Sequence, residues 1–196
     1  MPSYQLAGEI LAEAFLHYRL MRYAFEGRSE DDFKKRVLYL YTHCAKAAAK
    51  YGGVIITPDK QGSVIWLNGH NFPLGLIKEV KAGMAALPFK LGAKSTLRLM
   101  NHDAVPEGWI KQNASAKMGY IWCIGVKQQA RGKGYARQLI DEAIAHMRAQ
   151  GMDEFWLKTE DEKNVAIYKQ LGFALMLETT VKSSGLKSWV FKKMNV

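Results

Sequence analysis

Apolar residues recur every three to four positions along the first fifty residues of the chain. The first series predicts a helix over residues 4–26. Ser29 and the three acidic residues after it are typical of a helix start, and the next apolar series predicts a helix to residue 51, where Gly52 and Gly53 end it. The chain therefore opens with two amphipathic helices.

Two short apolar runs follow, residues 54–57 and 63–67, on either side of a stretch that contains Pro58 and Gly62. Such runs around a turn predict a β-hairpin. Trp66, in the second run, has two interpretations. It lines an acceptor pocket, or it is an ordinary buried aromatic of the core.

Residues 68–117 have the weakest periodicity in the chain. Their apolar spacing predicts a helix over about 74–87, which Pro88 ends, and a shorter helix over 91–100. We expect residues 101–109 to form a loop.

The second half of the chain alternates strands with helices. The pattern predicts a strand at 120–126, a helix at 137–150, a strand at 153–159, a short helix from 164 to Gly172, and a closing hairpin of 173–182 and 186–194. Strands interspersed with helices indicate an α/β (α+β) fold. The chain contains neither an internal repeat nor a linker, so residues 1–196 are expected to form a single domain.

The composition is that of a globular protein, with 48% hydrophobic and 23% charged residues. The longest apolar runs are too short to span a bilayer, and the first residues lack the features of an export signal. Cys44 and Cys123 fall on a predicted helix and a predicted strand, so we expect reduced core residues rather than a disulfide or a metal site. A cytoplasmic monomer or homodimer without membrane association is the expectation.

A glycine-rich turn lies between the strand at 120–126 and the helix that follows it. Gly132 and Gly134 accept positive φ without steric cost, so the turn can present unpaired N–H groups at the positive end of the helix dipole. Arg131, Lys133 and Arg137 add positive charge. The turn therefore predicts a diphosphate site. It is neither a P-loop nor a Gly-x-Gly-x-x-Gly dinucleotide motif.

Two segments resemble a known family. Residues 129–134 (Gln-x-x-Gly-x-Gly) resemble the Gln/Arg-x-x-Gly-x-Gly/Ala signature of the Gcn5-related N-acetyltransferases, the GNAT family. One strand–helix unit later, Asn164, Tyr168 and residues 171–173 (Leu-Gly-Phe) resemble the Asn…Tyr…Leu-Gly-Phe element of that family. The four-residue step from Asn164 to Tyr168 is similar to that of the puromycin N-acetyltransferase branch.

The resemblance implies a mixed sheet of about six strands, flanked by helices and splayed between the family's fourth and fifth strands. Because the predicted first helix begins near residue 4, the family's first strand would be short or missing. The resemblance further implies an N-terminal half, residues 1–117, with a helical lid inserted at 70–112. Residues 118–196 would form the acetyl-CoA-binding half.

The resemblance also implies acetyl-CoA as cosubstrate and assigns roles to residues. The edge of the fourth strand, with Cys123, Ile124 and Val126, would bind the pantetheine arm and the acetyl oxygen. Asn164 would contact the pantetheine, and Tyr168, protonated at neutral pH, would donate a proton to the departing thiolate. The diphosphate site would comprise Gln129, Arg131, Gly132, Lys133, Gly134, Tyr135 and Ala136. No metal is implied.

The base that takes the proton of the amine is left open. Puromycin-type members have an acid where this chain has Lys158, so the role of that acid is not carried over. Glu160, His102, Tyr120 and a chain of water molecules are the alternatives. Lys158 itself suggests an acceptor with an anionic group.

The leading interpretation is an acetyl-CoA-dependent N-acetyltransferase that acts on a primary amine of a small molecule by direct attack in a ternary complex. The alternatives are a protein or peptide N-acetyltransferase, and a non-catalytic acyl-CoA sensor or nucleic-acid-binding module. The net charge of +10 suits either a nucleic acid or a polyanion such as coenzyme A. Because the chain has no block of five like charges and no Cys/His finger, nucleic acid is not the expected partner.

Overall fold

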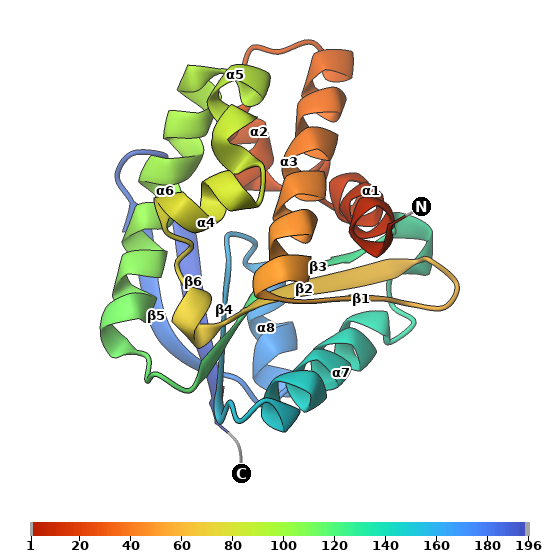
Figure 1. The fold of residues 1–196 in the computed structure, drawn as a ribbon, viewed down its shortest axis with the longest axis vertical. Coiled ribbons are helices and arrows are strands. Elements are labelled where there is room, and N and C mark those ends of the chain that lie inside the picture. The colour runs from red at the N-terminus through yellow and green to blue at the C-terminus, as the bar shows by residue number, and fades with distance from the viewer. Residues whose placement is uncertain (1, 195–196) are drawn as a thin grey trace.

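Six strands form one mixed sheet with helices on both faces (Figure 1). The structure is a computed structural model that describes residues 2–194. The strands lie in the order β1-β2-β3-β4-β6-β5, and their bounds are β1 Gly52–Ile56, β2 Gly62–Asn68, β3 Met118–Val126, β4 Glu154–Thr159, β5 Ala174–Val181 and β6 Leu186–Met194. This sheet confirms the predicted fold class, and both predicted hairpins, β1–β2 and β5–β6, are antiparallel pairs.

Eight α-helices and three 3₁₀ turns are described over residues 2–194. They are α1 Ser3–Phe15, α2 Arg19–Ala24, α3 Glu30–Tyr51, α4 Leu76–Lys81, α5 Leu87–Leu91, α6 Ala93–Asn113, α7 Tyr135–Ala149 and α8 Lys163–Gln170, with η1 Gly69–Asn71, η2 Met84–Ala86 and η3 Gln128–Ala130. The first described element is thus a helix, as expected. None of the described helices combines the length and the apolar character that a membrane span requires.

The predicted helix over residues 4–26 is two helices. α1 and α2 are separated because Tyr18 adopts an extended conformation, with φ −72° and ψ 132°. The Tyr18 hydroxyl donates to Glu160 Oε2 at 2.8 Å and accepts from the Glu160 backbone N–H at 2.7 Å. A contact with a residue far along the chain therefore interrupts a helix that local periodicity favours.

The predicted helix start at Ser29 is confirmed, because its side chain accepts the Asp32 backbone N–H at 3.3 Å. α3 then packs closely on α1. A Cβ added at Gly8 of α1 would lie 2.5 Å from Thr42 Cα of α3, so only glycine allows this approach. The close contact fixes the two helices against each other, and both pack in the same hydrophobic cluster on one face of the sheet.

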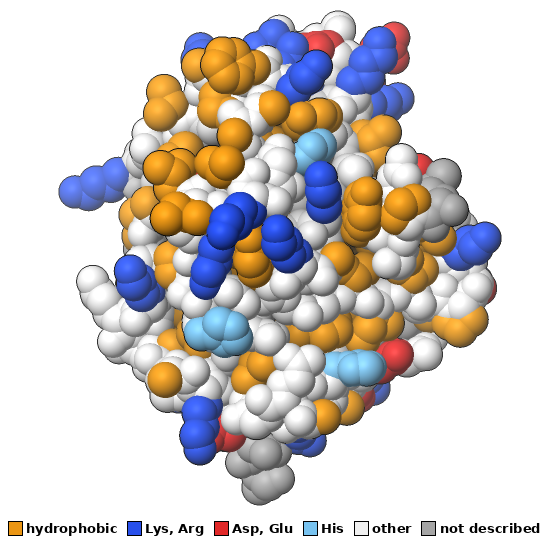
Figure 2. Space-filling model, viewed as in Figure 1, with side chains coloured by type: hydrophobic (Ala, Val, Ile, Leu, Met, Phe, Trp, Pro, Cys, Tyr) orange, Lys and Arg blue, Asp and Glu red, His pale blue; other side chains and the backbone are white. Residues whose placement is uncertain are grey.

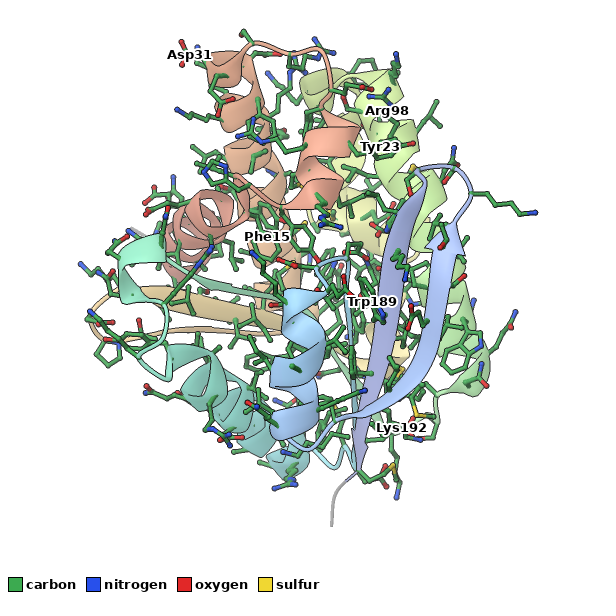
Figure 3. The ribbon with its side chains drawn as sticks, turned by 180° about the vertical axis from the view of Figure 1, so that it is seen from behind. Phe15, Tyr23, Asp31, Arg98, Trp189 and Lys192 are labelled. Carbon is green, nitrogen blue, oxygen red and sulfur yellow. The ribbon has the colours of Figure 1, made fainter. Side chains whose placement is uncertain are left out.

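The segment between β2 and β3 is more helical than the sequence predicts. Pro88 lies in the first turn of α5, where its missing N–H has no cost, instead of ending a helix. The loop expected at 101–109 belongs to the 21-residue helix α6, which has Pro106 buried inside it. Arg98 of α6 donates to the Tyr23 carbonyl of α2 at 2.9 Å (Figure 3). Tertiary contacts of this kind stabilise a helix where the local sequence signals are weak.

α4 and α5 lie on the outside of the molecule and pack only partly into its core. Apolar side chains gather on the outer surface over these helices (Figure 2), and Leu76, Ile77, Val80 and Phe89 are exposed. No residue of α4 is buried. This part of the chain therefore forms a cover over the structure below it.

The sheet opens between its two parallel neighbours. β3 and β4 pair only at three positions near their starts, the last being Tyr120 with Trp156. β3 also has a bulge, since its register with β2 passes from Cys123 to Ile121 and leaves Trp122 between them. This opening is the splay expected between the family's fourth and fifth strands, which are β3 and β4 here.

Separate hydrophobic clusters lie on the two faces of the sheet. One packs α1, α2 and α3 against the sheet, and another packs α7 and α8 against it. Trp66 belongs to the second cluster, with 3% of its surface exposed and its ring centroid 6.0 Å from that of His146. Of its two interpretations, the core aromatic is the one that the structure supports.

Candidate active site

A cavity of about 740 Å³ lies beside the opening between β3 and β4. Its walls come from α1 to α6, from β3, and from the end of β4 through α8. Phe15, labelled in Figure 3 at the end of α1, lines the cavity. Its ring stacks on that of Tyr41, with centroids 4.8 Å apart. Cys44 and Cys123, both free, lie on its wall. The cavity thus lies between the N-terminal helices and the second half of the chain.

The edge of β3 faces this cavity beyond the point where β4 diverges. Cys123 and Ile124 line the cavity, whereas Val126 lies further on, next to the glycine turn. On its other edge β3 stays paired with β2 as far as Val126. Because β4 no longer pairs with this stretch, its backbone N–H groups on the open side are free to bind an extended ligand.

The glycine turn leads into α7 with its backbone donors free. Gly132 and Gly134 have φ of 78° and 85°, and a Cβ at either position would meet no other group within 4 Å. Over the described residues, the N–H groups of residues 132–137 donate no hydrogen bond within the chain. Such a row of donors at the N-terminus of a 15-residue helix suits a diphosphate.

The polar side chains of the turn mostly serve to fix its position. Arg131 donates to the carbonyl oxygens of Val126, at 3.3 Å, and of Ala14, at 3.1 Å. Gln129 donates to the Gln61 side chain at 3.1 Å. The turn is thereby tied to α1 and to the β1–β2 hairpin.

The remaining predicted residues of the turn differ in their surroundings. Tyr135 donates its hydroxyl to Asp59 and is half-buried, as is Ala136. Lys133 is exposed and forms no ion pair with any residue from 2 to 194. Arg137 is likewise exposed and without an ion pair among residues 2–194, so Lys133 and Arg137 are both free cations beside the row of N–H donors.

Asn164 and Tyr168 lie on α8 and both line the cavity. Asn164 donates to Thr159 Oγ1 at 3.0 Å, which orients its side chain. The Tyr168 ring packs against Phe191, with centroids 5.4 Å apart, and its hydroxyl has no hydrogen-bond partner within the described part of the chain. Burial raises the pKa of Tyr168, so the phenol is protonated at neutral pH.

A buried polar network occupies the end of β4. Lys158 Nζ lies 2.7 Å from Asp103 Oδ1 and 3.1 Å from Glu160 Oε1. Glu160 also accepts from the Ser188 hydroxyl at 3.2 Å and lies 3.3 Å from His102 Nε2. Together with Tyr18, these groups join α2, α6 and β6 to the end of β4.

This network bears on the alternatives left open for the base. Lys158 and hydrogen bonds from its neighbours hold the pKa of Glu160 at about 2, against the effect of burial. Burial and the nearby Glu107 raise the pKa of Tyr120. His102 is fully buried, with Nδ1 2.8 Å from the Ser184 hydroxyl, and does not line the cavity. None of these three is placed as a ready proton acceptor.

Glu107 is the site residue that the sequence analysis missed. It lines the cavity from α6, and burial together with Asp103 raises its pKa to about 8. The four-residue step from Asp103 to Glu107 could have indicated the pair, because it places both side chains on one face of a helix. The signal was hidden because residues 101–109 were expected to form a loop.

Taken together, a sheet that diverges over a cavity, a row of free N–H groups at a helix start and a protonated tyrosine define a coenzyme A-dependent acyltransferase. The sequence profile of the acetyltransferase (GNAT) family matches residues 65–173. The chain belongs to this family. It is an acetyltransferase, and acetyl-CoA is its acetyl donor. The puromycin-type branch stays a prediction.

Relatives of the chain include an uncharacterized N-acetyltransferase of Schizosaccharomyces pombe, 23% identical over 176 residues, which are 87% of this chain and 70% of that protein. A mycothiol acetyltransferase of Thermobispora bispora is 32% identical over 72 residues, 33% of this chain. The chain covers only 24% of that enzyme. Among solved structures, a polyamine N-acetyltransferase of Drosophila melanogaster superimposes with a TM-score of 0.61 over 98% of this chain and 94% of its own, at 15% identity, and so supports the fold alone.

Proposed function

We propose that the protein transfers the acetyl group of acetyl-CoA to a primary amine of a small molecule, by direct attack in a ternary complex. Residues 1–196 act as one domain, in which residues 118–196 bind the donor and the segment 70–112 covers the acceptor. The observation that carries this proposal is the cavity of about 740 Å³ that reaches from Tyr168 to the inner side of α4 and α6. The helices α4 and α5 lie over part of this cavity, which suits a small acceptor, whereas a protein terminus needs a fully open groove.

The donor would lie along the opening of the sheet. The N–H groups of residues 132–137 bind the diphosphate, with Lys133 beside them. The other residues of the turn hold the turn itself in position. Cys123 and Ile124 present backbone to the pantetheine and to the acetyl oxygen, and Val126 continues this edge toward the diphosphate. Asn164 contacts the pantetheine. This arrangement aims the thioester at Tyr168.

The chemistry needs an acid for the leaving group. The amine nitrogen attacks the thioester carbon, the C–N bond forms, and the C–S bond breaks as the tetrahedral intermediate collapses. Tyr168 donates its proton to the departing thiolate, which avoids the release of a charged sulfur into a buried site. Residues 2–194 contain no cluster of three His, Cys, Asp or Glu side chains placed to bind a metal ion.

Replacing Tyr168 by Phe is expected to lower kcat severalfold to a hundredfold, because the thiolate loses its proton donor while the ring keeps its packing. The affinity for acetyl-CoA, measured by calorimetry, should stay near wild type. Tyr39→Phe is the matched control, since Tyr39 stacks on His43 and does not line the cavity. An unchanged kcat for Tyr168→Phe would remove Tyr168 from the mechanism.

Free-thiol release with a panel of small amines and of peptides tests the function itself. Small amines are expected to be acetylated and peptides to be poor acceptors. Turnover of peptides alone would favour a protein N-acetyltransferase. A melting shift with acetyl-CoA but no thiol release from any acceptor would indicate an acyl-CoA sensor.

A further inference from the structure

The charge of the cavity is opposite to that of the whole chain. The protein has 28 Lys and Arg residues against 18 Asp and Glu, yet four carboxylates and one lysine line this cavity. The carboxylates are Glu79, Asp103, Glu107 and Glu160, and the cation is Lys158. A cavity with an excess of negative charge attracts a cation.

Two of these carboxylates lack a cationic partner. Lys158 is already paired with Asp103 and Glu160, at 2.7 and 3.1 Å. Glu79 and Glu107 form no ion pair with a residue between 2 and 194. The positive charge that Lys158 contributes is therefore used within the protein, so the expectation of an acceptor with an anionic group loses its basis.

Glu107 is the more deeply placed of the two. It lines the large cavity and also a smaller one of about 100 Å³, whose wall includes Phe72, Pro73 and Trp122. The Tyr120 hydroxyl donates to Glu107 Oε1 at 3.4 Å, a long bond that leaves the carboxylate free to accept another donor. The carboxylate thus stands at the junction of two hollows, the larger of which has a mostly apolar lining.

We propose that Glu107 is a catalytic residue that binds the ammonium group of the acceptor and takes its proton, and that the acceptor is a primary amine on an apolar skeleton. This inference rests on the proposed function. The skeleton would lie among the apolar side chains of the cavity wall, which include Leu40, Val80, Leu87, Leu99 and Met100. An acceptor with a carboxylate or a phosphate would find no unpaired cation among the described residues of the wall.

The proton balance of the step is complete. The ammonium group gives one proton to the Glu107 carboxylate, and the neutral amine attacks the thioester carbon. When the C–S bond breaks, the thiolate takes a proton from Tyr168, which recovers one from the positively charged nitrogen of the intermediate as the neutral amide forms. The products are the N-acetylated amine and coenzyme A, and Glu107 returns its proton to solvent.

The surroundings of Glu107 set the pH at which it can act. The groups that face it are Asp103 on α6, Glu79 on α4, Tyr120 on β3, and Lys158 and Glu160 at the end of β4. Burial and the nearby carboxylates raise the pKa of Glu107 to about 8, despite the opposing effect of Lys158. Below that pH the carboxyl is protonated and cannot accept a proton, so the rate falls as the pH is lowered.

The test is free-thiol release at saturating acetyl-CoA with 2-phenylethylamine, hexylamine, glycine and glutamate as acceptors, over pH 6–10. The two apolar amines should react and the two anionic ones should not. For the wild type, kcat/KM should rise with pH and level off near pH 8. This limb of the pH profile should keep its position when a less basic apolar amine is used. Glu107→Gln should lower kcat/KM by about 10²- to 10³-fold and remove that limb.

The control is Glu142→Gln, an acid-to-amide change on the exposed side of α7, which should leave rate and pH profile unchanged. Glu107→Gln should melt no lower than wild type and keep its melting shift with acetyl-CoA. If the variant fails to fold, the acceptor panel and the pH profile of the wild type still test the role of Glu107 and the class of acceptor. Preference for the anionic amines, or a limb that follows the pKa of the amine, would overturn the inference. Thiol release with none of the amines would instead contradict the proposed function.

Discussion

Glu160→Gln is expected to lower the free energy of unfolding by about 3 kcal/mol, because it removes one partner of a buried ion pair. The Glu160 side chain is 2% exposed and accepts from Lys158, Tyr18 and Ser188. The amide retains only part of these interactions. Urea unfolding followed by circular dichroism measures the change.

Glu178→Gln is the matched control. Glu178 also lies 3.1 Å from a lysine, Lys187, but on the surface, where solvent screens the pair. Its replacement should change stability very little. Equal effects of the two variants would show that burial of the network at the end of β4 contributes nothing to stability.

The same network should make the stability of the protein depend on pH in the acid range. The pKa of Glu160 is lowered from the ordinary 4.5 to about 2 by Lys158 and by hydrogen bonds from its neighbours, including Tyr18. A carboxyl whose pKa is lower in the folded state stabilises the protein fully above about pH 4.5 and loses this contribution as the pH falls toward 2. Between these values, the stability of wild type should therefore fall more steeply than that of Glu160→Gln.

Replacing both Gly132 and Gly134 by Ala should weaken acetyl-CoA binding by a hundredfold or more. Each alanine at positive φ costs about 1–2 kcal/mol, so the turn would relax away from the conformation that presents its N–H groups. Neither added Cβ meets another group within 4 Å, so the fold itself should survive. Calorimetric titration with coenzyme A gives the affinity, and thermal melting without ligand checks the fold.

The matched control is the double variant Gly27→Ala and Gly151→Ala. Both glycines have φ near that of the turn glycines, 82° and 83°, and open space around them, but they lie away from the start of α7. The control should lose similar stability and keep its affinity for coenzyme A. Equal affinities in the two double variants would show that the turn does not hold the diphosphate.

The sequence alone determined the features that depend on neighbours in the chain. The cap at Ser29, the two hairpins and the positive φ of Gly132 and Gly134 follow from local steric and hydrogen-bonding preferences. The order of strand, glycine turn and helix placed the free N–H groups, because a helix start always leaves its first donors unpaired. The same local patterns carried the resemblance to the GNAT family.

Only the tertiary structure decided which distant side chains meet. Tyr18 breaks the first predicted helix because its hydroxyl bonds to Glu160, a partner 142 residues away that no local pattern reveals. The continuation of α6 through Pro106 placed Asp103 and Glu107 on the cavity wall, where the sequence had indicated a loop. The ionisation of each carboxylate then follows from burial and from the charges around it, and these exist only once the chain has folded.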